Sequence, residues 1–78
     1  MTWYEVWFVW ATTYDVDDMY LHGKFNWGKF DYSWLNSTKA RPYKFYSIKE
    51  AQDFINYQKE ECPGGDTYGD FEIRKKVV

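Results

Sequence analysis

The sequence contains little of several things on which common protein classes depend. Its 78 residues include one cysteine, one histidine, and only ten Val, Ile or Leu. With a single cysteine no internal disulfide can form, which argues against a disulfide-held secreted domain and favours a reducing, cytoplasmic compartment. One His, one Cys and no Cys-x-x-Cys pair exclude a structural zinc site, and we expect neither a metal nor another cofactor.

An excess of positive charge and a long hydrophobic run are also missing. Ten bases against twelve acids give a net charge of −2, which argues against a strongly basic nucleic-acid binder. The longest apolar run, 3–11, is interrupted by Glu5 and is too short to span a bilayer, so no membrane partner is expected. The length predicts a single domain over 1–78.

Aromatic side chains are what the sequence has in excess, with five Trp, eight Tyr and six Phe. Because aliphatic residues are scarce, the core must be largely aromatic, and each ring can bury roughly 150–250 Å². A sheet with one or two helices has too few inward positions for all these rings. Some must therefore lie at the surface, where Trp and Tyr are typical of binding hot spots.

The apolar pattern predicts an α+β domain with a small antiparallel sheet of about four strands. Residues 3–12 are expected to form either a central strand or a strand whose second face meets something besides water, because their even-numbered face is wholly apolar and their odd-numbered face is mixed. Residues 28–35 alternate cleanly between apolar and polar. The segments 43–46 and 70–77 are also β-prone, which completes the expected strands.

One long helix and one short helix are predicted. Ser47 to Glu50 form a capping box before an apolar stripe at helical spacing, which predicts a helix over 48–61. A short helix at about 15–22 would have Asp15 as its N-cap and Gly23 as its stop. A hairpin strand over 19–25 is the alternative for this segment.

The expected order is therefore β, short α, β, β, α, β. This order matches a ferredoxin-like sandwich in outline. Since the first helix is short for a crossover, an antiparallel β-meander with one helix packed across it is the alternative.

No motif predicts catalysis. Residues 15–18 resemble part of a calcium loop but lack the glycine and the distal glutamate of an EF-hand. Residues 63–66 lack the following Lys-Ser/Thr of a phosphate loop. His22 has no partner that the sequence defines. We therefore predict no catalytic residues, and the protein is not expected to be an enzyme.

The acids are segregated along the chain. From Glu50 to Glu72 seven acids accompany one base, Lys59. This pattern predicts an acidic rim for a partner with a basic surface, combined with aromatic anchors. The predicted binding residues are Trp3, Trp7 and Trp27 as anchors and Asp15, Asp17, Asp18, Glu60, Glu61, Asp66 and Asp70 as the rim. We expect a small non-enzymatic binding protein.

In size, acidity and lack of catalytic groups the chain resembles the small inhibitors that bacteriophages encode against host defence nucleases, such as anti-CRISPR proteins. The resemblance covers composition and element order alone, so it carries over no functional residues. It implies that the partner is a basic protein that handles nucleic acid.

Two other functions stay open at this point. Basic residues between aromatics, as in 27–30 and 43–46, are typical of platforms for single-stranded nucleic acid or a nucleotide. The second open function is a homo-oligomeric module, in which the surplus aromatic side chains pair with those of another copy. Both a monomer and a homodimer are compatible with the sequence.

Overall fold

The computed structural model describes the backbone of residues 1–78 and every side chain except that of Asp66. The strands are β1 (Thr2–Trp10), β2 (Met19–Asn26), β3 (Lys29–Leu35) and β4 (Gly69–Val77). The helix is α1 (Ile48–Glu61), and two short 3-10 turns are η1 (Thr12–Tyr14) and η2 (Gly65–Tyr68). The predicted strands 3–12, 28–35 and 70–77 correspond to β1, β3 and β4, with ends shifted by one or two residues.

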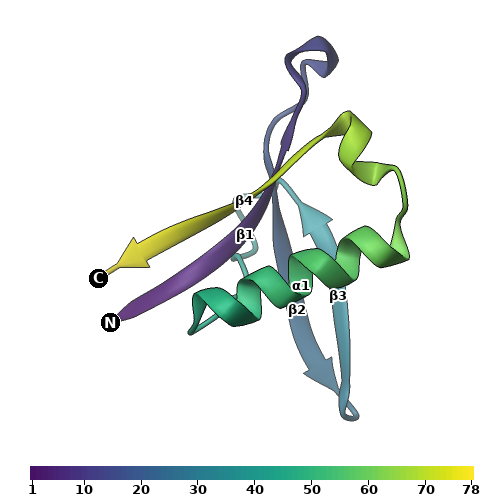
Figure 1. The fold of residues 1–78 in the computed structure, drawn as a ribbon. Helices are drawn as coiled ribbons and strands as arrows, with labels where there is room; N and C mark the ends of the chain where they lie inside the picture. Colours follow the sequence, from purple (N-terminus) through teal and green to yellow (C-terminus); the bar gives the residue numbers. More distant parts are fainter.

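The four strands form one antiparallel sheet in the order β3-β2-β1-β4, and α1 crosses one face of it (Figure 1). The α+β class and the central position of β1 are confirmed. The chain order β-β-β-α-β is that of the meander with one helix. The ferredoxin-like alternative is wrong, because β2 follows β1 directly and pairs with it instead of crossing over.

The predicted short helix at 15–22 is also wrong. Met19 begins β2, which pairs with β3 from Tyr20 to Asn26, so the hairpin-strand alternative is correct. Asp15 does not cap a helix; it has a left-handed φ of 44° and ends η1. Gly23 is not a stop but lies within β2, where its missing side chain leaves room for the ring of Phe30.

The segment 43–46 is not a strand of the sheet but fills a gap in it. β1 and β2 pair over only two residues each, and the β1–β4 pair and the β2–β3 hairpin then diverge, as Figure 1 shows. In the gap, Phe45 exchanges two backbone hydrogen bonds with Tyr4, of 2.7 and 2.9 Å. The Tyr43 N–H donates to the Leu21 carbonyl at 2.8 Å. The segment therefore completes the backbone pairing that β1 and β2 leave open.

The core between α1 and the sheet is aromatic, as predicted. Val6 and Leu21 are fully buried at its centre, and Phe54 is the main contribution of the helix. The rings that pack around Phe54 are Phe30, Tyr32, Trp34, Phe45 and Tyr57. These contacts are mostly edge-on or tilted, which is the geometry that aromatic pairs prefer.

The helix α1 spans the predicted residues 48–61. The Ser47 hydroxyl accepts the Glu50 N–H at 3.1 Å, which satisfies one of the free amide groups of the first turn. Ala51, Phe54 and Ile55 are buried, as the apolar stripe predicts. After Glu61 the chain turns back over the end of the sheet through η2.

Candidate functional site

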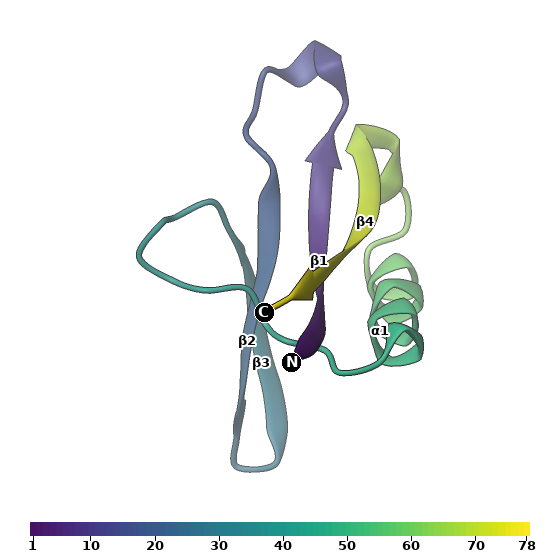
Figure 2. The ribbon, with the colours of Figure 1, turned by 90° about the vertical axis from the view of Figure 1, so that its left-hand side faces the viewer.

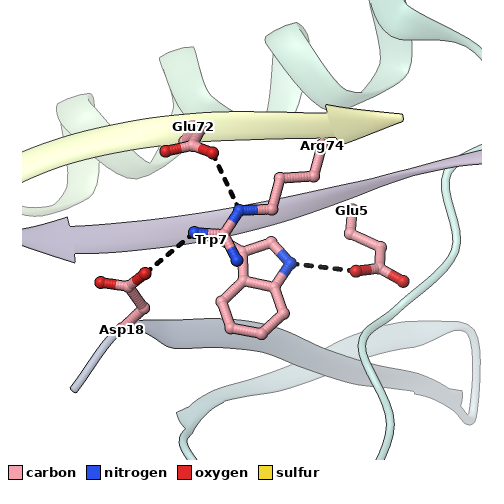
Figure 3. A network of polar contacts seen from close by, with 5 residues as sticks. All are labelled: Glu5, Trp7, Asp18, Glu72 and Arg74. Atoms are coloured by element: carbon pink, nitrogen blue, oxygen red, sulfur yellow. Dashed lines mark hydrogen bonds and ion pairs between the residues drawn. The ribbon is translucent and has the colours of Figure 1, made fainter. Parts of the chain in front are cut away.

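The face of the sheet away from α1 carries a buried carboxylate. Glu5, on β1, is only 6% exposed. Its two carboxylate oxygens accept one indole N–H each, from Trp3 and Trp7, both at 3.0 Å. Figure 3 shows the bond from Trp7. Strand alternation places these three side chains on one face, so the carboxylate lies between the two indoles.

Two cations cover the indoles from neighbouring segments. The ammonium of Lys44 lies 4.3 Å from the centre of the Trp3 ring, and the guanidinium of Arg74 lies 4.2 Å from that of Trp7. Such cation–π contacts stabilise most when they are shielded from water. The N–H group and one ring face of each of these two predicted anchors are therefore already occupied within the chain.

Arg74 links this network to two carboxylates. It donates to Glu72 at 2.8 Å and to Asp18 at 2.9 Å, as Figure 3 shows. Burial alone lowers the pKa of the Arg74 guanidinium, but the bonds to Glu72 and Asp18 outweigh it and raise this pKa above its ordinary value. Asp18, a predicted rim residue, is thus half-buried and tied to β4.

Trp27 lies at the tip of the β2–β3 hairpin and is 99% exposed. Its φ is 56° and that of Gly28 is 77°; two positive φ values in a two-residue loop define a type I′ turn. Asn-Gly is the favoured pair in such a turn, and a bulky residue at positive φ is strained. A side chain this exposed gains nothing from packing, so the fold itself does not explain a tryptophan here.

We therefore expect Trp27→Asn to raise the free energy of unfolding by about 1 kcal/mol, because asparagine tolerates the left-handed conformation that tryptophan does not. Urea unfolding followed by circular dichroism would measure this. The control Trp27→Ala keeps a residue unsuited to positive φ and should give no such gain. A loss of stability in Trp27→Asn would show that the exposed ring supports the fold.

The loop 11–18 and the segment 60–72 meet at the end of the sheet opposite the hairpin tip (Figure 2). The Ala11 N–H donates to the Tyr68 carbonyl at 2.9 Å, and the rings of Tyr14 and Tyr68 lie 5.7 Å apart. These two segments hold eight acids and no base, whereas the rest of the chain holds four acids and all ten bases. We call residues 11–18 and 60–72 the acidic end.

Every predicted rim residue belongs to the acidic end. The side chains of five of them are exposed: Asp15, Asp17, Glu60, Glu61 and Asp70. Asp18 is held by Arg74. The predicted role of Asp66 concerns a side chain outside those that the structure describes.

An open pocket of about 240 Å³ borders the acidic end, which contributes Cys62, Gly65, Tyr68 and Phe71 to its lining. Its walls are mainly the rings of Phe8, Trp10, Trp34, Tyr68 and Phe71, with Gln58 from α1. Lys59 also lines the pocket. In the sequence it directly precedes the acidic segment 60–72.

Two polar atoms of the pocket residues have no partner. The Trp10 indole Nε1 and the Gln58 amide Oε1 are buried without a hydrogen bond to any described residue, while the Gln58 Nε2 donates to the Cys62 Sγ at 3.2 Å. Leaving such a group unpaired costs roughly 1–3 kcal/mol. Both atoms are buried behind the pocket surface, so a ligand would reach them only if the Trp10 or Gln58 side chain turned.

The sequence does not reveal this pocket. Trp10 lies on the wholly apolar even-numbered face of the predicted strand 3–12, and no motif includes Gln58 or Tyr68. A signal existed for Gln58, since it continues the buried positions 51, 54 and 55 of α1 at helical spacing. A polar residue on an otherwise apolar stripe indicates either a paired core group or a binding group.

The predicted sites therefore lie in three places: the Glu5 network, the hairpin tip and the acidic end. The Glu5 network and the acidic end meet where Arg74 binds Asp18 and Glu72. Trp27 and the acidic rim, which the sequence grouped together, are at opposite ends of the molecule (Figures 1 and 2). Among the described side chains no cluster of three His, Cys, Asp or Glu is placed to hold a metal ion. His22 donates its Nδ1–H to the Arg41 carbonyl at 2.9 Å, which holds the 36–47 connection against β2.

Within the described part of the chain, no helix combines the length and the apolar character needed to cross a membrane. Comparison with family models, curated proteins and solved structures gave no significant match. The candidate site is therefore defined by its own geometry.

Proposed function

We propose that the protein is a non-enzymatic binding protein whose acidic end docks on the basic surface of another protein. The observation that carries this is an open aromatic pocket beside two segments that together hold eight acids and no base, with Lys59 in the pocket wall and Arg74 paired to two of the acids. The charge favours encounter with a basic surface, and the pocket supplies an anchor site whose occupation removes apolar area from water.

The pocket indicates the chemistry of the partner. At about 240 Å³ it is smaller than the roughly 300–1,000 Å³ of pockets that enclose drug-sized ligands, so it suits a single side chain. The apolar walls favour an aromatic or aliphatic side chain, and the surrounding acids favour Lys or Arg beside it. A free nucleic acid is disfavoured at this end, because its phosphates would meet carboxylates.

Nucleic-acid-handling proteins present such basic surfaces. A host nuclease whose nucleic-acid groove is occupied by the acidic end would be inhibited, which is the mode of action that the resemblance to phage-encoded inhibitors implies. We include inhibition of such a partner in the proposal. It rests on charge complementarity and on no sequence relationship.

The test uses a lysine-rich peptide with one tryptophan as the probe. We expect the peptide to bind more weakly as salt is added, because salt screens the attraction between exposed charges. We also expect binding to weaken at least about tenfold when Glu60, Glu61 and Asp70 are changed to lysine, because the exposed acids that attract the peptide are replaced by bases that repel it. Isothermal titration calorimetry at low and high salt would measure both effects.

The matched control changes the same number of exposed acids outside the acidic end: Asp31, Glu50 and Asp53 to lysine. Both variants gain the same net charge, so an effect of net charge alone would weaken their binding of the peptide equally. Equal weakening, or binding indifferent to salt and to both sets of reversals, would overturn the proposal. A peptide of the same charge without tryptophan should bind more weakly if the pocket is the anchor site.

A further inference from the structure

The hairpin tip of this chain has the chemistry that the acidic end selects. We define the hairpin tip as residues 24–29. Trp27 is 99% exposed and Phe25 is 68% exposed, and the exposed lysines Lys24 and Lys29 flank them. This is a protruding aromatic side chain between two cations in the sequence. The tip of the β2–β3 hairpin lies at the opposite end of the molecule from η1 and η2 (Figure 2).

We propose that Trp27 of one copy enters the aromatic pocket of a second copy, with Lys24 and Lys29 facing the acidic rim of that copy. This inference rests on the acidic end being a docking surface, as in the proposed function, and adds a second copy of this chain as an occupant. It also gives a reason for the strained tryptophan at the turn, which the fold does not supply.

The contacts match in three respects. An indole ring finds the rings of Trp34 and Phe71 in the pocket walls. Gln58 also lines the pocket, and its buried Oε1, which has no partner within the described chain, can accept the indole N–H once this amide turns toward the ring. The lysines of the tip match the acids of the acidic end in charge, while Lys59 is the one charged residue in the pocket wall itself. The two-residue turn also fixes the tip before binding, so little conformational entropy is lost.

The tip and the pocket lie at opposite ends, so the contact is heterologous: each copy uses its tip on one neighbour and its pocket on another. Such contacts build rings or open chains. One side chain and its rim make a small interface, so we expect weak association that increases with concentration and falls with salt. A second copy would compete with the basic partner for the same pocket.

The test mixes two variants that each lack one half of the contact. Trp27→Asn removes the tip and is expected to fold at least as well as the parent chain. The Glu60→Lys, Glu61→Lys, Asp70→Lys variant keeps the tip and reverses the rim. We expect the parent protein to self-associate at low salt, each variant alone to associate at least about tenfold more weakly, and their mixture to form a one-to-one complex that grows no further. Sedimentation velocity over a concentration series would show this.

Several results would overturn the inference. The parent protein sedimenting as a monomer at every concentration would do so, as would Trp27→Asn associating as strongly as the parent. A mixture of the variants that stays monomeric would exclude the tip-in-pocket contact. Binding of a single-stranded oligonucleotide by the parent but not by Trp27→Asn, without self-association, would assign the tip to nucleic acid. Binding of the lysine-rich peptide at the acidic end can persist in all these cases. The proposed function is therefore tested independently of the self-association.

Discussion

Replacing Glu5 by glutamine is expected to lower the free energy of unfolding by about 2 kcal/mol, and replacing it by alanine by about 3 kcal/mol. Glu5 is 94% buried, and each carboxylate oxygen accepts one indole N–H. Glutamine keeps one acceptor oxygen and turns an amide donor toward the other indole, so one N–H loses its partner. Alanine leaves the indole donors of both Trp3 and Trp7 unpaired.

The cations over the two indoles add to this cost. Lys44 and Arg74 lie on the rings that hold Glu5, so the negative charge is surrounded by positive charge that its removal leaves unbalanced. The control is Glu72→Gln, which removes an exposed partner of the same Arg74. Exposed ion pairs contribute little, so this control should cost less than about 1 kcal/mol. Urea unfolding followed by circular dichroism compares the variants, and equal losses would show that the Glu5 network does not stabilise the sheet.

The fold was predictable where local signals and tertiary contacts agree. The helix at 48–61 has a cap in Ser47, a buried apolar stripe and a glycine-rich end, and each signal has the same meaning in the folded chain. At 15–22 the local signals suggest a helix as well, with an acid before it and Gly23 after it. There the pairing of β2 with β3 prevails, because a hairpin buries Leu21 and satisfies the backbone of a whole strand.

The candidate site was predictable to a smaller extent. The segregation of acids is visible in the sequence because the acidic end consists of only two segments. The pocket depends on η2 folding back against β1, a contact between residues 57 positions apart that no local pattern reveals. The sequence placed Trp3 and Trp7 on one face with Glu5, but it gave no sign that Lys44 and Arg74 would cover them.

The three sites have different roles at the two ends and in the middle of the molecule. The Glu5 network ties β1 to β4 and to the 36–47 connection in the middle of the sheet, and it uses its tryptophans internally. The ends carry what remains available for partners: a cationic aromatic tip and an acidic aromatic pocket. The surplus of aromatic residues therefore serves core, network and two binding ends, each with a different degree of exposure.

Gly69→Ala is expected to lower the free energy of unfolding by about 3 kcal/mol, because the overlap it creates involves backbone that no side-chain rotation can relieve. Gly69 begins β4 and pairs with Trp10. A Cβ at this position would overlap the carbonyl oxygen of Val9 and would lie 2.8 Å from the Trp10 Cα. The φ of Gly69 is extended, at 170°, so the glycine is required by close approach and not by a special conformation.

The same substitution should also damage the pocket. Relief of the overlap has to move the start of β4 away from Trp10, which separates η2 and Tyr68 from the loop that the Ala11–Tyr68 bond holds. Binding of the tryptophan-containing lysine peptide should therefore weaken even at temperatures where the variant is folded. The control is Gly65→Ala, whose Cβ would make an ordinary 3.6 Å contact with Cys62 in the same region and should change the free energy of unfolding by less than about 0.5 kcal/mol. If the two variants had the same free energy of unfolding and the same peptide binding, β4 would approach β1 less closely than described. The pocket would then not depend on the close contact between β4 and β1.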